Sequence, residues 1–174
     1  MNDYNIFEIW SRRIPKFDTK YSIDLFDKLA KKGGGNDEKQ NQYGKIFNTF
    51  YELYIYCFFL GLYNNERLEI PKQNKTDFSH AIEFWGNKKN RNDRDDFSSL
   101  QKSIFVGCFV KTEINILDLE IGKAKPEDIV EQLIKTLEEY TKGGCEILLE
   151  ALNKNPQIVT INTKFVDMIF NSKD

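Results

Sequence analysis

The sequence contains few of the residues from which catalytic and metal sites are usually built. It has one histidine, His80, and its three cysteines, Cys57, Cys108 and Cys145, form no CxxC pair. A zinc site needs clustered His and Cys ligands, and a hydrolase of the nucleophile-elbow type needs a GxSxG turn, which is also absent. We therefore expect no catalytic residues, no metal and no cofactor.

An excess of positive charge is lacking as well. Lysine and arginine number 25, aspartate and glutamate number 27, and the formal net charge is −2. Such a balance does not attract a polyanion to the whole molecule, so contact with nucleic acid would require a local basic patch. The N-terminal residues do not place a basic segment before an apolar run, as a secretory signal would. Together with the unpaired cysteines, this predicts a cytoplasmic protein.

No apolar run is long enough to cross a membrane. The run from Leu53 to Tyr63 has about half of the roughly 20 residues that a bilayer core requires. It contains tyrosines, whose hydroxyl groups are costly in mid-bilayer but can reach partners at the rim of a protein core. We expect no membrane span, and we interpret the run as part of a central helix, residues 38–63, that is buried on nearly all sides.

What the sequence does contain is helical periodicity with capping signals. Ser22 and Thr76 are typical N-caps, Pro126 suits a first helical position, and Gly143 and Gly144 are typical of a helix end. The segment after Ser98 is rich in β-branched and aromatic residues, so a strand is the alternative there, although its length and spacing favour a helix. The expected helices span 22–32, 38–63, 77–85, 100–122, 126–142, 145–155 and 160–170.

These elements predict an all-α fold. We expect a single helical domain, residues 1–174, in which six or seven helices form a bundle around the central aromatic-rich helix. Residues 1–20 are expected to be an irregular N-terminal arm, because Pro15 interrupts any helix there. Residues 86–97 are expected to be a polar surface loop, because Gly86 to Asp96 contains no apolar side chain.

Basic side chains are the candidates for contact with a partner or with nucleic acid. Those in the polar loop could track phosphates in a salt-sensitive way. The interleaved Asp93, Asp95 and Asp96 reduce that positive field, so a solvated loop is the alternative interpretation. The candidate binding residues are Arg12, Arg13, Arg67, Lys88, Lys89, Arg91 and Arg94.

The wall of the central helix is a candidate pocket for a small ligand. Aromatic side chains would line it, and an ionisable group with a perturbed pKa would mark it as functional. Glu52 needs a partner such as Arg67 or a tyrosine hydroxyl if it is buried, and otherwise lies on an exposed strip of the helix. The residues of this candidate pocket are Glu52, Tyr54, Phe58, Tyr63 and His80.

Pairs of carboxylates are candidates for acid–base sites. Glu138 and Glu139 are adjacent, so on a helix they point in different directions, and Asp118 and Glu120 lie in an apolar segment. The pattern is that of an ordinary protein surface.

One stretch carries a resemblance to a known group of proteins. In YIYCFFLGLYNNERLEI, an aromatic-rich helix leads through Gly61-Leu62 into a polar turn with Asn65 and Arg67 and an Ile70-Pro71 exit. This resembles small accessory proteins of bacterial DNA-phosphorothioation (Dnd-type) and related phage-defence loci, and residues 129–152 are loosely similar to the same group. The resemblance implies a non-catalytic partner of larger modification or restriction enzymes and carries over no catalytic residues.

Three hypotheses about function follow. The first is a non-catalytic accessory protein that binds another macromolecule, with a protein as the expected partner, in a DNA-modification or phage-defence system. The second is a nucleic-acid-binding protein that uses the local basic residues. The third is an enzyme or small-ligand binder with the pocket beside the central helix.

Overall fold

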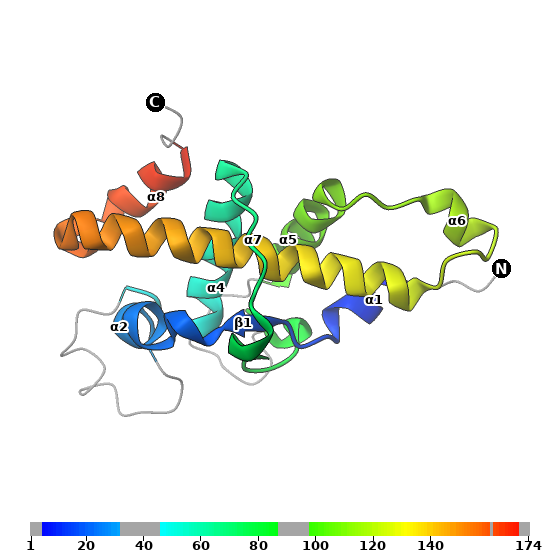
Figure 1. Cartoon of the computed structure of the whole chain (residues 1–174), viewed down its shortest axis with the longest axis horizontal. Coiled ribbons are helices and arrows are strands. Elements are labelled where there is room, and N and C mark those ends of the chain that lie inside the picture. Colours follow the sequence, from blue (N-terminus) through cyan, green and yellow to red (C-terminus); the bar gives the residue numbers. More distant parts are fainter. Residues whose placement is uncertain (1–4, 32–45, 87–97, 161, 171–174) are drawn as a thin grey trace. The chain divides into compact units, whose positions relative to one another are not determined.

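The computed structural model describes residues 5–31, 46–86, 98–160 and 162–170, and these ranges are mostly helical (Figure 1). The predicted helical class is confirmed, with the addition of one small sheet in which β1 (Lys16–Asp18) pairs with β2 (Lys75–Asp77). The arrangement of a bundle around a central aromatic helix stays a prediction. The α-helices of the described ranges are α1 (Ile6–Ser11), α2 (Asp27–Leu29), α4 (Phe50–Asn64), α5 (Ser98–Lys111), α6 (Ile116–Glu120), α7 (Pro126–Lys154) and α8 (Asn162–Phe170).

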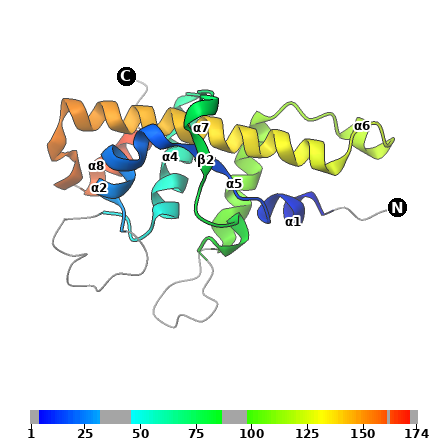
Figure 2. The ribbon, with the colours of Figure 1, turned by 60° about the horizontal axis from the view of Figure 1, so that its bottom comes forward.

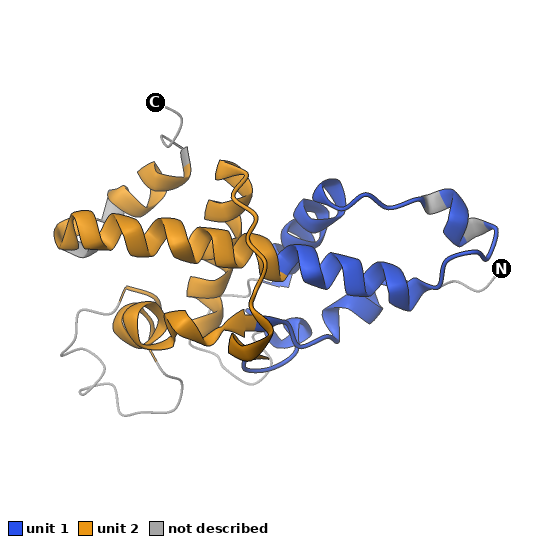
Figure 3. Ribbon diagram, viewed as in Figure 1, with its two compact units in different colours: residues 1–16, 77–137 blue, residues 17–76, 138–174 orange. Residues whose placement is uncertain are grey.

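The chain divides into two compact units, each made of two separate stretches (Figure 3). Unit 1 comprises Met1–Lys16 and Asp77–Leu137, and unit 2 comprises Phe17–Thr76 and Glu138–Asp174. Helix α7 contributes its first part to unit 1 and its second part to unit 2. The single domain expected from the sequence stays a prediction, and the units are described one at a time.

Unit 1 has an aromatic core between α1 and α5. The Asn5 side chain caps α1 by accepting a hydrogen bond from the Glu8 amide, which starts the helix that buries Trp10 completely. The Phe105 ring lies edge-on to Phe7 and to Trp10, with centroid distances of 5.4 and 5.3 Å. The predicted irregular arm therefore contains a short helix, followed after Pro15 by strand β1.

The prediction of a helix at 77–85 is wrong. Strand β2 extends to Asp77, Ser79 adopts a left-handed conformation with φ of 52°, and only Ile82–Phe84 form a short 3₁₀ turn. The backbone amides of Phe78 and Ile82 instead donate to the carbonyl groups of Pro15 and Arg13. Pairing with the N-terminal segment replaces the local helical hydrogen bonds that Thr76 was expected to start.

The segment 100–122, predicted as one helix, forms two helices that are separated by irregular residues. Helix α5 buries Gln101, Ile104 and Cys108 on one face and ends at Lys111. Irregular residues follow, and Asn115 then caps the short α6 by accepting from the amides of Leu117 and Asp118. The helical interpretation of this segment is therefore confirmed for 98–111, and the strand alternative is wrong there.

In unit 2, α4 and the second part of α7 approach each other through glycines. A Cβ atom built on Gly144 would lie 1.8 Å from the Cys57 carbonyl oxygen, and one on Gly61 would lie 2.0 Å from that of Tyr140. Figures 1 and 2 both show α7 as one unbroken helix. The prediction that Gly143 and Gly144 end a helix is therefore wrong. Both glycines lie inside the helix, where the absence of a side chain lets the carbonyl groups of Glu66 and Cys57 come close.

The remaining elements of unit 2 surround this helix pair. Residues Ser22–Phe26 form a wide helical turn that continues into α2, in place of one regular helix. Helix α8 packs on α4, where the Tyr56 hydroxyl donates to the Phe165 carbonyl oxygen at 2.9 Å. The Thr49 side chain caps α4, and Asn65 ends it in the left-handed conformation.

Candidate functional site

Unit 2 contains a small, partly open cavity with several polar and charged side chains in its wall. Its volume of about 10 Å³ is room for about one water molecule. The lining residues come from β1, the turn after it, the segment before β2 and one face of α7. They are Phe17, Asp18, Tyr21, Ile70, Glu138, Thr141, Lys142 and Cys145.

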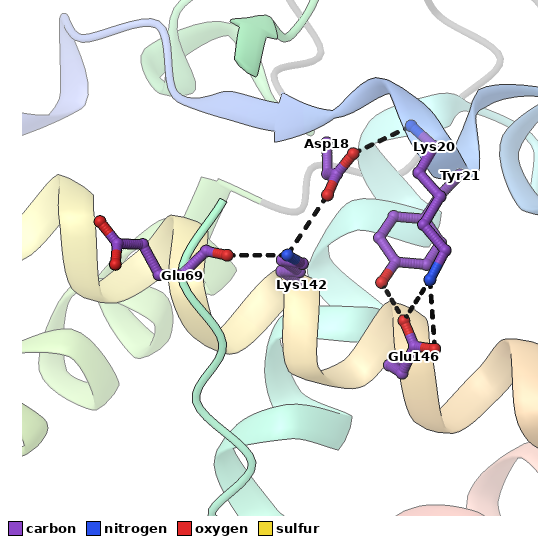
Figure 4. A network of polar contacts seen from close by, with 6 residues as sticks. All are labelled: Asp18, Lys20, Tyr21, Glu69, Lys142 and Glu146. Atoms are coloured by element: carbon purple, nitrogen blue, oxygen red, sulfur yellow. Dashed lines mark hydrogen bonds and ion pairs between the residues drawn. The ribbon is translucent and has the colours of Figure 1, made fainter. Parts of the chain in front are cut away.

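One strip of α7 supplies charged side chains in and beside the cavity wall. Glu138, Lys142 and Glu146 follow each other at four-residue spacing, which places them on the same side of the helix. The N-terminal segment of unit 2 brings Asp18, Lys20 and Tyr21 against that strip, as Figure 4 shows for Asp18, Lys142 and Glu146 with their partners.

Asp18 and Lys142 are the most deeply buried charged pair in the network. Their side chains are 1% and 14% exposed, and the Lys142 Nζ lies 3.4 Å from the Asp18 Oδ2. The same Nζ donates to the Glu69 carbonyl oxygen at 2.7 Å, and the Asp18 Oδ1 accepts from the Lys20 amide at 3.0 Å. A buried charge is tolerated when it is paired and hydrogen-bonded, and both groups meet that condition.

Glu146 accepts hydrogen bonds from two donors. The Tyr21 hydroxyl donates to its Oε2, and the Lys20 Nζ lies 2.9 Å from the same oxygen. These hydrogen bonds, from Tyr21 first and Lys20 second, hold the pKa of Glu146 below its usual value. Burial, together with the neighbouring Glu146 carboxylate, raises the pKa of Tyr21 well above its usual range.

Two further ion pairs join α7 to the chain before and within β2. The Lys75 Nζ lies 2.6 Å from the Glu138 Oε2, and the Arg67 Nε lies 2.6 Å from the Glu139 Oε2. The Arg67 guanidinium also lies over the Tyr140 ring, 5.8 Å from its centroid. Glu138 and Glu139 are buried, so the expectation that they form an ordinary surface is wrong. Cations from other segments make that burial tolerable.

The cavity also touches a buried thiol. Cys145 lies in its wall and is buried, as is Cys57 of α4. Burial first, and Cys57 second, raises the pKa of the Cys145 thiol. In unit 1, burial alone raises the pKa of Cys108.

The predicted binding residues belong to different units or lie outside the described residues. Arg12 and Arg13 are exposed and belong to unit 1, whereas Arg67 belongs to unit 2 and pairs with Glu139. Lys88, Lys89, Arg91 and Arg94 lie outside the described residues, as does the polar loop from residue 87 onward.

The residues of the predicted pocket have different surroundings. Glu52 lies in the first turn of α4, where its Oε2 accepts from the Asn48 amide at 2.8 Å. Tyr54 and Phe58 are completely buried in the core, and Tyr63 is half exposed. His80 belongs to unit 1, is exposed, and its Nδ1 lies 2.7 Å from the Ser79 Oγ. Partial burial lowers the pKa of His80.

Asp18, Lys142, Glu146 and Cys145 are not among the site residues predicted from the sequence. The four-residue spacing of Glu138, Lys142 and Glu146 was a visible signal, but ordinary exposed helices show the same spacing. Their burial depends on the segment around Asp18, more than 100 positions away in the chain.

The charged groups of this site form ion pairs that join α7 to β1, to the turn after it and to β2. Within the described ranges, no group of three or more His, Cys, Asp or Glu side chains could hold a metal ion. Among the described helices, none combines the length and apolar character needed to cross a bilayer. Comparison of the chain with protein-family models, with curated proteins and with solved structures gives no match.

Proposed function

We propose that the chain is a non-catalytic accessory protein that binds another protein through unit 1. The observation that carries this proposal is a set of large apolar side chains that unit 1 exposes to solvent. Val106 and Val110 of α5 are 57% and 74% exposed, and Leu117 and Ile121 at α6 are 60% and 54% exposed. Exposed apolar side chains that share a strip are typical of protein-binding surfaces.

The strip on α5 is separate from the buried face of that helix. Val106 and Val110 are four residues apart and lie one above the other. Val106 comes two positions after the buried Ile104, and Val110 comes two positions after the buried Cys108. Two positions correspond to about 200° around the helix. Helix α5 is therefore apolar on the side that faces its own core and again on the opposite side, and a second protein would find contact area there.

The resemblance to accessory proteins of DNA-phosphorothioation and phage-defence loci supports the choice of partner. In such a system the partner would be a larger modification or restriction enzyme, and this chain would act in the same cytoplasmic compartment. Proteins encoded beside this chain are the first candidates to test.

The test is co-elution in gel filtration with each of these neighbouring proteins. We expect one of them to co-elute with the full chain. The double variant Val106→Gln, Val110→Gln should lose that complex, because it removes the apolar strip and places good helix formers at both positions. The matched control is Ile23→Gln, Val166→Gln, which changes exposed apolar side chains of unit 2.

Two outcomes would contradict the proposal. One is that no neighbouring protein co-elutes with the unmodified chain at any concentration tested. The other is that both double variants bind as the unmodified chain does, with unchanged far-UV circular dichroism. A complex made only of copies of this chain would replace the accessory role with self-association.

A nucleic-acid-binding function is the second candidate, because Arg12 and Arg13 are adjacent and both exposed. A gel-shift series over increasing salt tests it. Binding through phosphates weakens steeply as salt rises, and Arg12→Gln, Arg13→Gln should reduce that dependence. Absence of a shift at low salt would remove this candidate.

A further inference from the structure

Unit 1 exposes an aromatic ring on a turn that is otherwise anchored in its core. Phe84 belongs to the short 3₁₀ turn Ile82–Phe84, and its side chain is 55% exposed. Its neighbours Ile82 and Trp85 are both buried. The turn therefore holds a large apolar ring in solvent, where it is available to a ligand that has a flat apolar face.

Hydrogen bonds from buried groups hold this turn in place. The Gln101 side chain of α5, itself buried, donates to the carbonyl oxygens of Glu83 and Trp85 at 3.2 and 2.7 Å. The Trp85 indole donates to the His80 carbonyl oxygen at 3.1 Å. The backbone on both sides of Phe84 is therefore fixed, so a ligand that contacts the ring would have little backbone entropy to remove.

A second ring lies beside that of Phe84. The His80 ring centroid is 6.2 Å from the Phe84 centroid, and the two planes are tilted by 54°. His80 is exposed, and the Ser79 Oγ lies 2.7 Å from its Nδ1, which orients the imidazole. Partial burial lowers the pKa of His80, so this ring is mostly neutral at pH 7. Flat side chains that lie together on a surface are what a base-stacking site requires.

Backbone pairing brings two arginines to the same part of unit 1. The Ile82 amide donates to the Arg13 carbonyl oxygen at 3.2 Å, and the Phe78 amide donates to that of Pro15 at 2.8 Å. The two segments therefore run side by side within unit 1. Arg12 and Arg13 are both exposed there, next to the turn that carries the rings.

The charge of this surface is positive but small. The charged side chains of the paired segments, 12–16 and 77–84, are Arg12, Arg13, Lys16, Asp77 and Glu83. Lys16 and Asp77 form an ion pair with each other. Two arginines against one glutamate attract phosphate only weakly, so a phosphate-containing ligand would need further affinity from the rings.

We propose that the surface made of Arg12, Arg13, His80 and Phe84 binds a single-stranded nucleic acid. The two guanidinium groups contact phosphates of the strand, and an unpaired base stacks on the Phe84 ring beside His80. A duplex cannot use the rings in this way, because its bases are already stacked on each other. The inference rests on the second candidate function above, which it narrows to single strands, and it is independent of the apolar strip on α5.

The test is fluorescence anisotropy with the full chain and three labelled probes: oligothymidylate, oligouridylate, and the duplex of oligothymidylate with oligoadenylate. We expect a single strand to bind more tightly than the duplex, and the tighter of the two single strands identifies DNA or RNA. For two phosphate contacts, the logarithm of the association constant should fall against the logarithm of salt with a slope of about −1.4. Arg12→Gln, Arg13→Gln should remove most of that slope.

Two variants of one residue separate stacking from simple apolar contact. Phe84→Leu keeps an apolar side chain but has no aromatic face, so it should weaken single-strand binding about tenfold without changing the salt slope. Phe84→Tyr keeps the ring and should bind as the unmodified chain does. Because Phe84 is exposed, both variants should keep the far-UV circular dichroism of the unmodified chain.

The inference is overturned if the duplex binds as tightly as the single strands, or if Phe84→Leu binds as tightly as Phe84→Tyr. In those cases the arginines alone would carry the second candidate function. The inference is also overturned if no probe binds at low salt, and that candidate function is then removed with it. If Phe84→Leu instead loses a co-eluting protein and no probe binds, the surface belongs to a protein partner.

Discussion

Units 1 and 2 both contain packed aromatic rings, but they differ in close backbone contacts and in buried charge. The described core of unit 1 is built from aromatic rings of α1 and α5, and its ion pair between Lys16 and Asp77 is exposed. Unit 2 joins α4 to α7 through glycines and holds Asp18 and Lys142 in a buried pair. Apolar side chains can repack to some extent when a neighbour changes shape. Two backbones in close contact cannot accommodate an added side chain, and a buried charge is destabilised when its partner is removed.

The difference indicates which changes each unit should resist. Loss of ring volume should weaken either unit, and unit 2 should also be weakened by an added methyl group at its glycine contacts or by a lost buried charge. Both tryptophans, Trp10 and Trp85, lie in unit 1, so tryptophan fluorescence reports on that unit while circular dichroism reports on the helices of both. Transitions that coincide by the two probes indicate cooperative unfolding of the whole chain.

The largest effect is expected from Trp10→Ala in unit 1. Trp10 is completely buried and packs against the Phe7 and Phe105 rings, so its loss should cost about 4 kcal/mol in free energy of unfolding. Urea unfolding followed by circular dichroism measures this. Its control is Trp10→Phe, which keeps a ring and removes an indole N–H that has no acceptor among the described residues. An equal loss in both variants would contradict the ring-volume explanation.

The next largest effect is expected from Gly144→Ala in unit 2. The new methyl group would meet the Cys57 carbonyl, which belongs to a helix backbone and cannot move aside, so we expect a loss of about 3 kcal/mol. Gly122→Ala in unit 1 is the control, because no atom lies within 4 Å of its Cβ position. That variant carries only the strain of a positive φ, about 1 kcal/mol. Urea unfolding compares the two, and equal losses would show that the helix contact is looser than described.

A smaller effect is expected from Asp18→Asn. The amide can still accept the Lys20 N–H, but Lys142 is left buried without its carboxylate, which should cost about 2 kcal/mol. Adding Lys142→Met should recover part of that loss, because the unpaired charge is then removed as well. The comparison of the single variants with the double variant measures the coupling. Purely additive losses would mean that the pair is not coupled.

The smallest effect is a change in pH dependence in Glu146→Gln. The folded-state pKa of Glu146 lies below its usual 4.5, so its contribution to stability is complete above pH 4.5 and is lost as pH falls through the lowered pKa. The variant should be less stable at pH 7 and should lose less stability between pH 5 and pH 3. Thermal melts over that range measure it, with the exposed Glu131→Gln of unit 1 as the control. Parallel pH profiles for the unmodified chain and Glu146→Gln would contradict the assignment.

Local signals in the sequence predicted some elements correctly. Pro126 at the first position with Glu127 and Asp128 in the first turn predicts the start of α7, and the structure begins the helix there. The apolar run 53–63 predicts a buried helix, and Leu53, Cys57 and Leu60 of α4 are buried. These features depend on neighbours within one or two turns, which the sequence displays directly.

Other features depend on segments that are distant in the chain. Gly143 and Gly144 look like a helix end, yet they allow the close approach of Glu66 and Cys57 and continue the helix. The segment 77–85 has the pattern of a helix, yet its amides pair with the N-terminal segment. The candidate site follows the same rule, because the partners of its charged strip on α7, among them Asp18, Lys20 and Lys75, come from distant segments.

The sequence by itself determined the helical class, the start of α7 and the burial of the aromatic run, because capping and periodicity act over a few residues. Only the tertiary structure decided that the two glycines are contact points and that Asp18 meets Lys142. A glycine or a charge has the same local preferences whether it is buried or exposed. What covers it comes from a different part of the chain, and that partner fixes its role.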